Sequence, residues 1–178
     1  MKLPLLIATG IGLSMCLNSC EDDPDNELPG ALQAYVPVYM TTSQKNYIYT
    51  SSERATEKSG KIYAFGNYIF QNDLNEGIHI IDNSDRKNPK KIAFLHIPYN
   101  TEFAVKGNYI YANNVNDLIV VDVRDIMNPV VVKRMENAFP YVSQDYPQQT
   151  GYFVCPDPKK GIVVAWESQN VKTPKCRR

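Results

Sequence analysis

The sequence predicts an all-β fold, and three observations support this. A pentapeptide Gly-Asn-Tyr-Ile-Phe at 66–70 recurs as Gly-Asn-Tyr-Ile-Tyr at 107–111, an offset of 41 residues. An apolar run that leads into an aspartate lies at 77–82 and again at 117–122, an offset of 40. Both copies then continue into an Asn-Pro pair. Several landmarks in register indicate an internal repeat, which is the first feature to establish when a fold is predicted.

Each copy divides into four short segments with β character. The expected strands are 61–65, 68–71, 78–81 and 90–96 in the first copy, and 103–106, 109–112, 118–121 and 130–135 in the second. The Gly-Asn pairs at 66–67 and 107–108 suit the positive φ of a tight hairpin. The runs at 78–81 and 118–121 are β-branched and apolar, so we expect these strands to be buried on both faces.

The loop after the third strand carries the same polar and proline positions in both copies. These structural repeat positions are Asp82, Asn88, Pro89, Asp122, Asn128 and Pro129. Asp and Asn side chains in such loops bond to nearby backbone amides, which favours a turn-capping role. The alternative is a calcium loop, but Arg86 stands where a ligand is needed and no suitably spaced glycine and glutamate follow. We therefore expect no metal.

A third, degenerate copy follows at 151–154 and 161–166, without the aspartate and the Asn-Pro pair. Four strands in every ~40 residues are typical of a propeller blade, which must stack on copies of itself. The predicted fold is an incomplete β-propeller-like array of about two clear four-stranded blades plus a partial third. Because closed propellers have about four to eight blades, the chain is alternatively a shortened relative that self-associates as a homo-oligomer through open sheet edges.

The N-terminus has the features of a secretory signal. Lys2 precedes an apolar stretch of about 15 residues, which is shorter than the roughly 20 needed for a membrane-spanning helix. The sequence Leu-Asn-Ser-Cys at 17–20 resembles a bacterial lipobox, so we expect lipid attachment at Cys20. Multiple acyl chains on one cysteine would anchor the chain stably. The acidic residues 21–23 resemble the surface-export signal of Bacteroides-type lipoproteins, although a solvated tether is a compatible interpretation.

These observations divide the chain into five parts. We expect a lipoprotein signal peptide at 1–19, a lipidated tether and N-terminal extension at 20–59, the first repeat at 60–100, the second repeat at 101–140, and the degenerate third repeat with the C-terminal tail at 141–178.

Charge and cysteine content narrow the possible partners. The 178 residues contain 19 Lys and Arg against 19 Asp and Glu, which disfavours a nucleic-acid binder. After removal of the signal and lipidation of Cys20, two cysteines remain, Cys155 and Cys176. In an oxidising compartment they could form a disulfide; the alternative is two free thiols. Two cysteines without a nearby histidine do not indicate a metal site, and no cofactor motif occurs.

The repeated pattern resembles a known family. The segments Leu-Ile-Val-Val-Asp at 118–122 and Ile-His-Ile-Ile-Asp at 78–82, each with its Asn-Pro, look like the LVIVD repeat of β-propeller proteins. Together with the lipobox, the chain resembles the N-terminal part of Bacteroides-type LVIVD-repeat lipoproteins. The resemblance implies a propeller-like fold and a place in the cell envelope, as an outer-membrane lipoprotein exposed at the surface. It implies no reaction.

Few residues indicate catalysis. Neither His79 nor His96 recurs in the other copy, so both are interpreted as ordinary strand side chains. Asp73 with Glu76, or Glu76 with Asp117, could pair as in a glycoside hydrolase, but we interpret these acids as solvated loop charges.

The tyrosines fall into two groups. The repeated Tyr68, Tyr109 and Tyr152 suit packing within the blades, whereas Tyr99, Tyr141 and Tyr146 lie in connecting segments, where amphipathic rings favour binding. We expect a non-catalytic, lipid-anchored module that binds a protein or a glycan. The alternatives are an envelope enzyme on a propeller scaffold, a glycan hydrolase or lyase, and a truncated, self-associating relative of a larger propeller.

Overall fold

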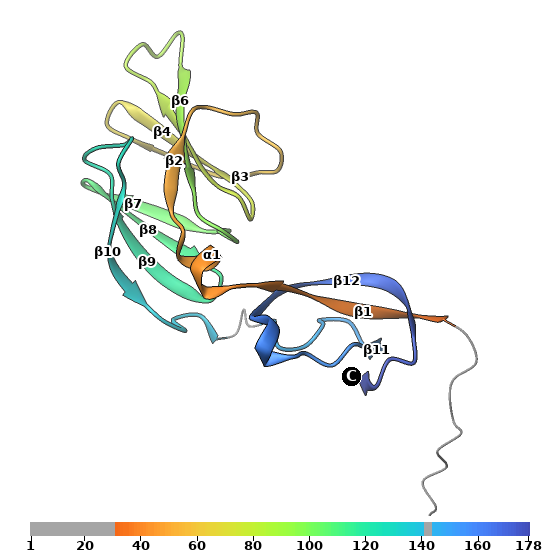
Figure 1. Cartoon of the computed structure of the whole chain (residues 1–178). Coiled ribbons are helices and arrows are strands. Elements are labelled where there is room, and N and C mark those ends of the chain that lie inside the picture. Colours follow the sequence, from red (N-terminus) through yellow and green to blue (C-terminus); the bar gives the residue numbers. More distant parts are fainter. Residues whose placement is uncertain (1–30, 141–143) are drawn as a thin grey trace, which may run out of the picture.

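The computed structural model describes residues 31–140 and 144–178, which form three β-sheets (Figure 1). The sheets of the two repeats lie together, and the third sheet lies on the other side of the short helix α1 (Thr42–Asn46). The expected signal peptide and the lipid-attachment residue Cys20 lie outside the described residues. No helix in the described part of the chain has the length and apolarity to cross a membrane.

The first repeat forms an antiparallel sheet with the strand order β2-β6-β5-β4-β3. Its strands are β2 (Tyr49–Ser51), β3 (Ser59–Phe65), β4 (Tyr68–Asp73), β5 (Gly77–Asp82) and β6 (Lys90–His96). The four strands expected from the sequence are present. The fifth strand, β2, comes from the N-terminal extension and pairs with the outer strand β6, so that Tyr49 lies opposite His96.

The second repeat forms a four-stranded antiparallel sheet in the order β10-β9-β8-β7. Its strands are β7 (Phe103–Lys106), β8 (Tyr109–Asn114), β9 (Asp117–Asp122) and β10 (Val130–Met135). The all-β, blade-like prediction is thus confirmed for both repeats. The outer strand carries a bulge at the equivalent place in each, near Ile92 in β6 and near Val132 in β10.

The hairpin turns depend on glycine. Phe65 pairs with Tyr68, so Gly66 and Asn67 alone form the turn, and Gly107 and Asn108 do the same in the second repeat. Gly66 has φ 60° and Gly107 has φ 58°. In both hairpins only the first of the two turn residues has positive φ. Glycine adopts this conformation readily, which explains why it occupies the first turn position.

The two repeat sheets pack face to face, and each sheet contributes a different set of repeat positions to the shared core. The shared core combines Phe70, Ile78 and Ile80 of the first sheet with residues such as Ile110 and Ile119 of the second. In the repeat alignment Ile119 matches His79, which lies on the opposite face of its strand from Ile78 and Ile80. Each repeat therefore has one face for the preceding sheet and another for the following sheet, as consecutive propeller blades do.

The remaining face of the first sheet is covered by residues 52–58. The guanidinium of Arg54 lies 5.0 Å from the ring centre of Phe94, and Lys91 Nζ donates to the Arg54 carbonyl at 3.1 Å and to Thr56 Oγ1 at 2.7 Å. His79 beneath this cover has no exposed surface. The run 78–81 is buried on both faces from Ile78 to Ile80, with Ile81 half-buried.

No segment among the described residues covers the outer face of the second sheet in this way. This face carries Tyr111, Leu118 and Val120, which are half-buried, and Met135, which is half-exposed. The prediction that 118–121 is buried on both faces is therefore wrong for this face. The physical reason is that Tyr111, Leu118 and Val120 occupy the positions of Phe70, Ile78 and Ile80, whose burial depends on a following sheet.

The third sheet combines the two ends of the described chain in the order β12-β1-β11-β13. Strand β1 (Ala31–Met40) runs antiparallel to β12 (Ile162–Lys172) and parallel to β11 (Tyr152–Phe153). A short helix, η2 (Pro158–Lys160), precedes β12, and β13 (Cys176–Arg177) pairs with β11. A disulfide joins Cys155 to Cys176, with their Cα atoms 5.3 Å apart, and fastens the C-terminal segment to this sheet.

Candidate functional site

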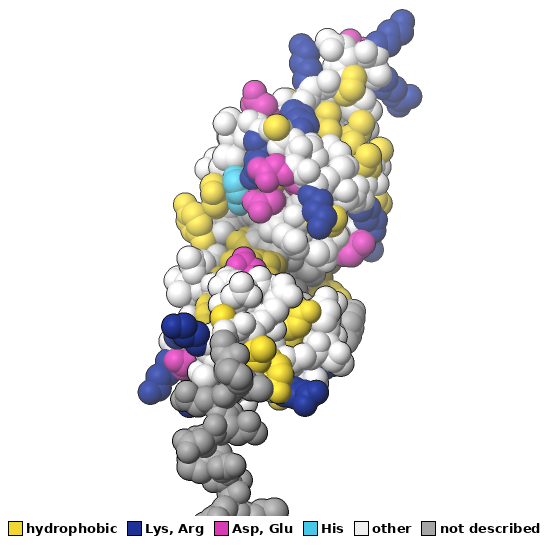
Figure 2. All heavy atoms as spheres, turned by 90° about the vertical axis from the view of Figure 1, so that its right-hand side faces the viewer, with side chains coloured by type: hydrophobic (Ala, Val, Ile, Leu, Met, Phe, Trp, Pro, Cys, Tyr) yellow, Lys and Arg dark blue, Asp and Glu magenta, His cyan; other side chains and the backbone are white. Residues whose placement is uncertain are grey.

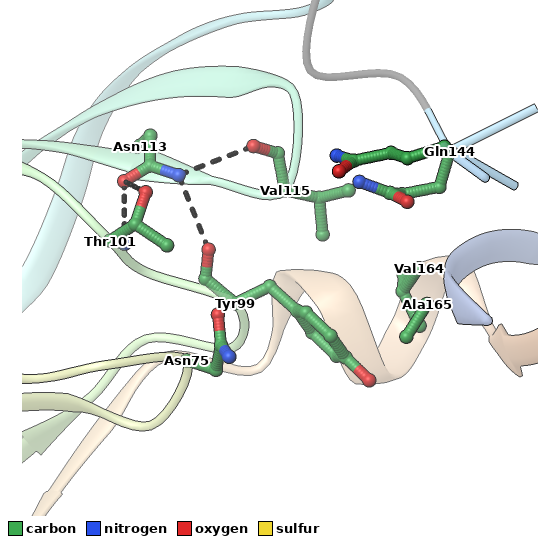
Figure 3. A pocket seen from close by; sticks show the side chains of 9 residues that line it. Asn75, Tyr99, Thr101, Asn113, Val115, Gln144, Val164 and Ala165 are labelled. Carbon is green, nitrogen blue, oxygen red and sulfur yellow. Dashed lines mark hydrogen bonds between the residues drawn. The ribbon is translucent and has the colours of Figure 1, made fainter. Parts of the chain in front are cut away.

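A cavity of about 340 Å³ lies where elements of all three sheets meet (Figure 3). Its lining combines amide, hydroxyl, phenol and apolar side chains and contains no charged residue: Asn75, Tyr99, Thr101, Asn113, Val115, Gln144, Gln148, Val164 and Ala165. We call this the amide cavity. Figure 3 shows the Tyr99 ring extending across it toward Val164 and Ala165 of β12.

Backbone strain is concentrated at the amide cavity. In the described part of the chain five non-glycine residues have positive φ, and three of them line it: Asn75 at 73°, Tyr99 at 55° and Val115 at 57°. Such a conformation is especially unfavourable for the β-branched Val115. Strained residues of this kind persist when the surroundings fix them, and they cluster at functional sites.

The strained backbone of Asn75 and Tyr99 is fixed by a pair of hydrogen bonds between two loops. The Asn75 amide donates to the Asn100 carbonyl, and the Tyr99 amide donates to the Asn75 carbonyl, both at 2.8 Å. The loop between β4 and β5 is thereby joined to the segment that connects the two repeats. This pairing sets the position of Tyr99 between the sheets.

The side chain of Asn113 holds the part of the cavity wall formed by Tyr99, Thr101 and Val115. Its Oδ1 accepts from the amides of Thr101 at 2.9 Å and Glu102 at 2.8 Å, while its Nδ2 donates to the carbonyls of Tyr99 at 3.2 Å and Val115 at 3.3 Å. One side chain therefore holds the two strained residues Tyr99 and Val115 at the same time.

A fully buried asparagine extends this network into the first repeat. Asn100 Nδ2 donates to the carbonyls of Glu102 and Asn113, both at 2.9 Å, and its Oδ1 accepts from Asn72 Nδ2 at 2.6 Å. Asn72 Nδ2 also donates to the Gly77 carbonyl at 2.9 Å. Buried polar groups with such partners rigidify the structure around them.

A second cavity of about 290 Å³ adjoins the amide cavity and shares Asn75 and Tyr99 with it. Its lining is mainly aromatic, with one carboxylate: Met40, Gln44, Tyr47, Tyr49, Asn75, Glu76, His96, Pro98 and Tyr99. We call this the aromatic cavity. Burial raises the pKa of Tyr99, and the carboxylates of Glu167 and Glu76 add to this effect, so its phenol stays protonated at neutral pH.

A buried ion cluster supports the β8–β9 turn behind Val115. Both Lys45 Nζ and Arg134 Nη1 lie 2.6 Å from Asp117 Oδ2, and the Asn137 amide donates to Oδ1 at 3.0 Å. Burial alone would raise the pKa of Asp117, but the bonds from Lys45, Asn137 and Arg134 outweigh it and leave the pKa below its usual range. The helix α1 is fixed to the second sheet through this cluster.

The candidate acids of the sequence analysis lie in three different environments. Asp73 is fully buried and accepts from the amides of Glu57 at 3.0 Å and Lys58 at 2.6 Å. These bonds outweigh the opposing effect of burial and lower its pKa. Asp117 is buried in the ion cluster, and the half-exposed Glu76 lies 3.4 Å from Arg54. Neither cavity brings two of these carboxylates together in its lining.

His79 and His96 have different surroundings. Nε2 of the fully buried His79 lies 3.3 Å from Asp73 Oδ2. Burial and the nearby Lys91 lower the pKa of His79 despite this acid, so the ring is neutral near pH 7. His96 is half-buried and lines the aromatic cavity.

The repeated aspartates lie at the other end of the sheets. Asp82 Oδ1 accepts from the Ser84 amide at 2.8 Å, and Asp122 Oδ1 accepts from the Arg124 amide at 3.0 Å. In the same loops the amides of Asn88 and Asn128 donate to the carbonyls of Asp85 and Asp125, just before Pro89 and Pro129. Among residues 31–140 and 144–178, no group of three His, Cys, Asp or Glu side chains is placed to hold a metal.

Of the connecting-segment tyrosines, Tyr99 lines both cavities, Tyr146 is 62% exposed beside Phe153, and Tyr141 lies outside the described residues. The sequence analysis did not identify Asn75, Asn113 or Val115. One signal was available, because Asn72 and Asn113 occupy equivalent positions at an offset of 41.

Stacked antiparallel sheets, each built on four repeat strands with a recurring aspartate loop, define a repeat protein of the propeller type. In agreement, residues 58–93 and 99–136 each match the LVIVD repeat. The chain therefore contains two LVIVD repeats. A search of curated proteins and a search of solved structures each found no match.

We predict that Asp117→Asn lowers the free energy of unfolding by about 3–5 kcal/mol at pH 7, because it leaves the buried Lys45 and the half-buried Arg134 without their counter-charge. Since the pKa of Asp117 is lowered by folding, its contribution is complete above the unfolded value of about 4 and is lost as the pH falls through the folded value. Urea unfolding at pH 7 and below pH 4 measures this, and the difference from the wild type should shrink in acid.

The matched control is Glu102→Gln, which removes the charge of an exposed pair with Lys61. Its effect should stay below about 1 kcal/mol. An Asp117→Asn protein as stable as the control at pH 7 would contradict the structural role of the cluster.

We predict that Val115→Gly raises the free energy of unfolding by about 1 kcal/mol. Relief of a left-handed conformation is worth about 1–2 kcal/mol, which exceeds the added chain entropy of glycine, about 0.5–1 kcal/mol. Thermal and urea unfolding provide the measurement. The control is Asn116→Gly at the next turn position, which has no positive φ and should lose stability. A destabilised Val115→Gly protein would show that Val115 is not strained.

Proposed function

We propose that the chain is a non-catalytic binding module whose amide cavity takes a neutral glycan, and that a lipid on Cys20 holds it at the outer surface of the cell envelope. The observation that carries the binding proposal is the coincidence of strain and polarity. Three unfavourable backbone conformations are maintained around one uncharged, amide-lined cavity. Maintained strain at a concave polar site is typical of binding and catalytic sites.

The chemistry of the lining favours a glycan over a charged ligand. The side chains of Asn75, Thr101 and Gln148, with the phenol of Tyr99, supply neutral donors and acceptors suited to hydroxyl groups. The ring of Tyr99 adds an amphipathic surface. The lining contains no lysine or arginine to pair with a carboxylate or phosphate. A peptide ligand is the alternative that the binding test distinguishes.

The positions of the acids support binding rather than hydrolysis. Glycoside hydrolases generally place two carboxyl groups on either side of the scissile bond. The buried carboxylates of Asp73 and Asp117 are already bonded to backbone amides or to cations, and the lining of the amide cavity includes no acid.

Two features support the location. The disulfide between Cys155 and Cys176 suits an oxidising compartment. Residues 21–30, which are rich in acids and prolines, separate Cys20 from the start of β1 at Ala31. A chain anchored at Cys20 would therefore have a spacer before its first strand.

We predict that the chain without residues 1–20 binds neutral oligosaccharides on a glycan array, followed by calorimetry on the best ligand. Tyr99→Ala should weaken binding about tenfold or more, because it removes the ring at the centre of the site. Tyr146→Ala, an exposed tyrosine outside both cavities, is the matched control and should bind as the wild type does. Binding of extended peptides but of no neutral oligosaccharide would replace the glycan by a protein ligand.

We further predict that the full chain, expressed in a bacterium that processes lipoproteins, gains diacylglyceryl mass on Cys20 and partitions into detergent. Cys20→Ser should abolish this modification, whereas Cys16→Ser should leave it unchanged. Intact-mass spectrometry distinguishes the two. An unmodified Cys20 in the mature chain would rule out the proposed anchor.

A further inference from the structure

The aromatic cavity differs in chemistry from the amide cavity beside it. Four of its lining residues carry rings, Tyr47, Tyr49, His96 and Tyr99, and its single charged lining residue is Glu76. The amide cavity has one ring and no charge. Although Tyr99 separates the two spaces, they would select different chemical groups.

The rings are held in fixed positions. The Tyr49 ring stacks on the His96 ring with centroids 4.2 Å apart and planes within 9°, because β2 places these residues opposite each other. Tyr47 lies next in line, 4.6 Å from Tyr49, and is 64% exposed. Nε2 of His96 is 2.9 Å from Ser51 Oγ, which fixes the imidazole. The outermost ring thus has a face open to solvent.

The charge at this cavity is negative. Burial and the nearby Arg54 lower the pKa of His96, so its ring is uncharged at neutral pH. Arg54 is 3.4 Å from Glu76, but it also pairs with Glu57 and lies over Phe94, and it does not line the cavity. Figure 2 shows histidine surface, in cyan, beside acidic side chains, with basic side chains adjoining them and an apolar patch nearby.

From this cluster we infer that the aromatic cavity binds an organic ammonium group, as a site separate from the glycan site proposed above. Cations are attracted to the faces of tyrosine rings, and recognition of quaternary ammonium groups by several aromatic side chains is the established use of this interaction. The carboxylate of Glu76 adds direct charge pairing, and the methionine side chain at position 40 adds apolar contact. The volume of about 290 Å³ accommodates a trimethylammonium group with its alkyl chain.

In the test, choline is titrated into the chain that lacks residues 1–20. This chain retains all three sheets, because their strands lie within residues 31–178. Binding is followed by tyrosine resonances in NMR spectra. The neutral isostere 3,3-dimethylbutan-1-ol has the same shape without the charge. We expect choline to bind at least about tenfold more tightly than the alcohol, because only choline has a positive charge that the tyrosine rings and the Glu76 carboxylate attract.

Three variants assign the contacts. Tyr47→Leu should reduce choline affinity about tenfold because the Tyr47 ring has the open face, Tyr47→Phe should retain it, and Glu76→Gln should weaken it severalfold. Tyr146→Leu, at an exposed tyrosine elsewhere, should change nothing. Equal binding of choline and the alcohol, no binding of choline, or full affinity in the Glu76→Gln protein would overturn the inference.

Two further comparisons are needed. The first distinguishes a free from a lipid-borne ammonium ligand, and the second distinguishes the ammonium site from the proposed glycan site. Choline and phosphatidylcholine vesicles are compared in parallel, and binding of either supports the inference while showing whether a free or a lipid-borne group is preferred. Tyr47 and Glu76 do not line the amide cavity, so glycan binding measured on the same variants should be unchanged. Failure of choline binding with intact glycan binding overturns only the ammonium site, and the reverse result overturns only the glycan site.

Discussion

The structure depends on three asparagine side chains, two fully buried and one half-buried, that tie the two repeats together at one end of their sheets. Asn100, in the segment between the repeats, is bonded to Asn72 on one side and to Asn113 on the other. An amide side chain suits this position because it donates and accepts at once, so it satisfies carbonyls and another amide together. Breaking these hydrogen bonds would leave buried amide groups without partners, which is costly, so the bonds specify one relative placement of the loops. The oxygen Oδ1 of Asn72 is the one buried side-chain atom of the three that has no partner. The cavity walls, with their unfavourable backbone conformations, follow from that placement.

Much of the fold could be predicted because the strands and turns of each repeat are indicated by residues close together in the sequence. The eight repeat strands, the hairpin glycines and the aspartate loops each follow from short stretches of sequence. Strands β1 and β2 could not be predicted in the same way. Strand β1 pairs with residues 162–172, more than a hundred positions away, and its sequence contains no sign of that partner. Strand β2 has only three residues and acquires its conformation by pairing with β6.

The candidate sites were less predictable for the same reason. Tyr99 could be singled out as a candidate binding residue from its position in a connecting segment. The cavities, however, combine loops of both repeats with β12 and with residues around α1, so their lining exists only after long-range pairing. Positive φ at Val115 is also invisible in the sequence, because valine normally indicates a strand. Where the two copies differ, the differences are informative: His79 replaces an isoleucine because its face meets residues 52–58 instead of another sheet.

In the described part of the chain, the outer face of the first repeat sheet is covered and that of the second is not, so the two ends of the stacked pair differ. At the first repeat, residues 52–58 occupy the place where a preceding sheet would lie, and Arg54 and Lys91 fasten them there. At the second repeat, Tyr111, Leu118 and Val120 present the same positions that the first repeat uses for stacking. The two ends of the stack therefore differ in chemistry. Among the described residues, the first end is closed by a polar and charged segment, whereas the second end presents half-buried apolar side chains to the surroundings.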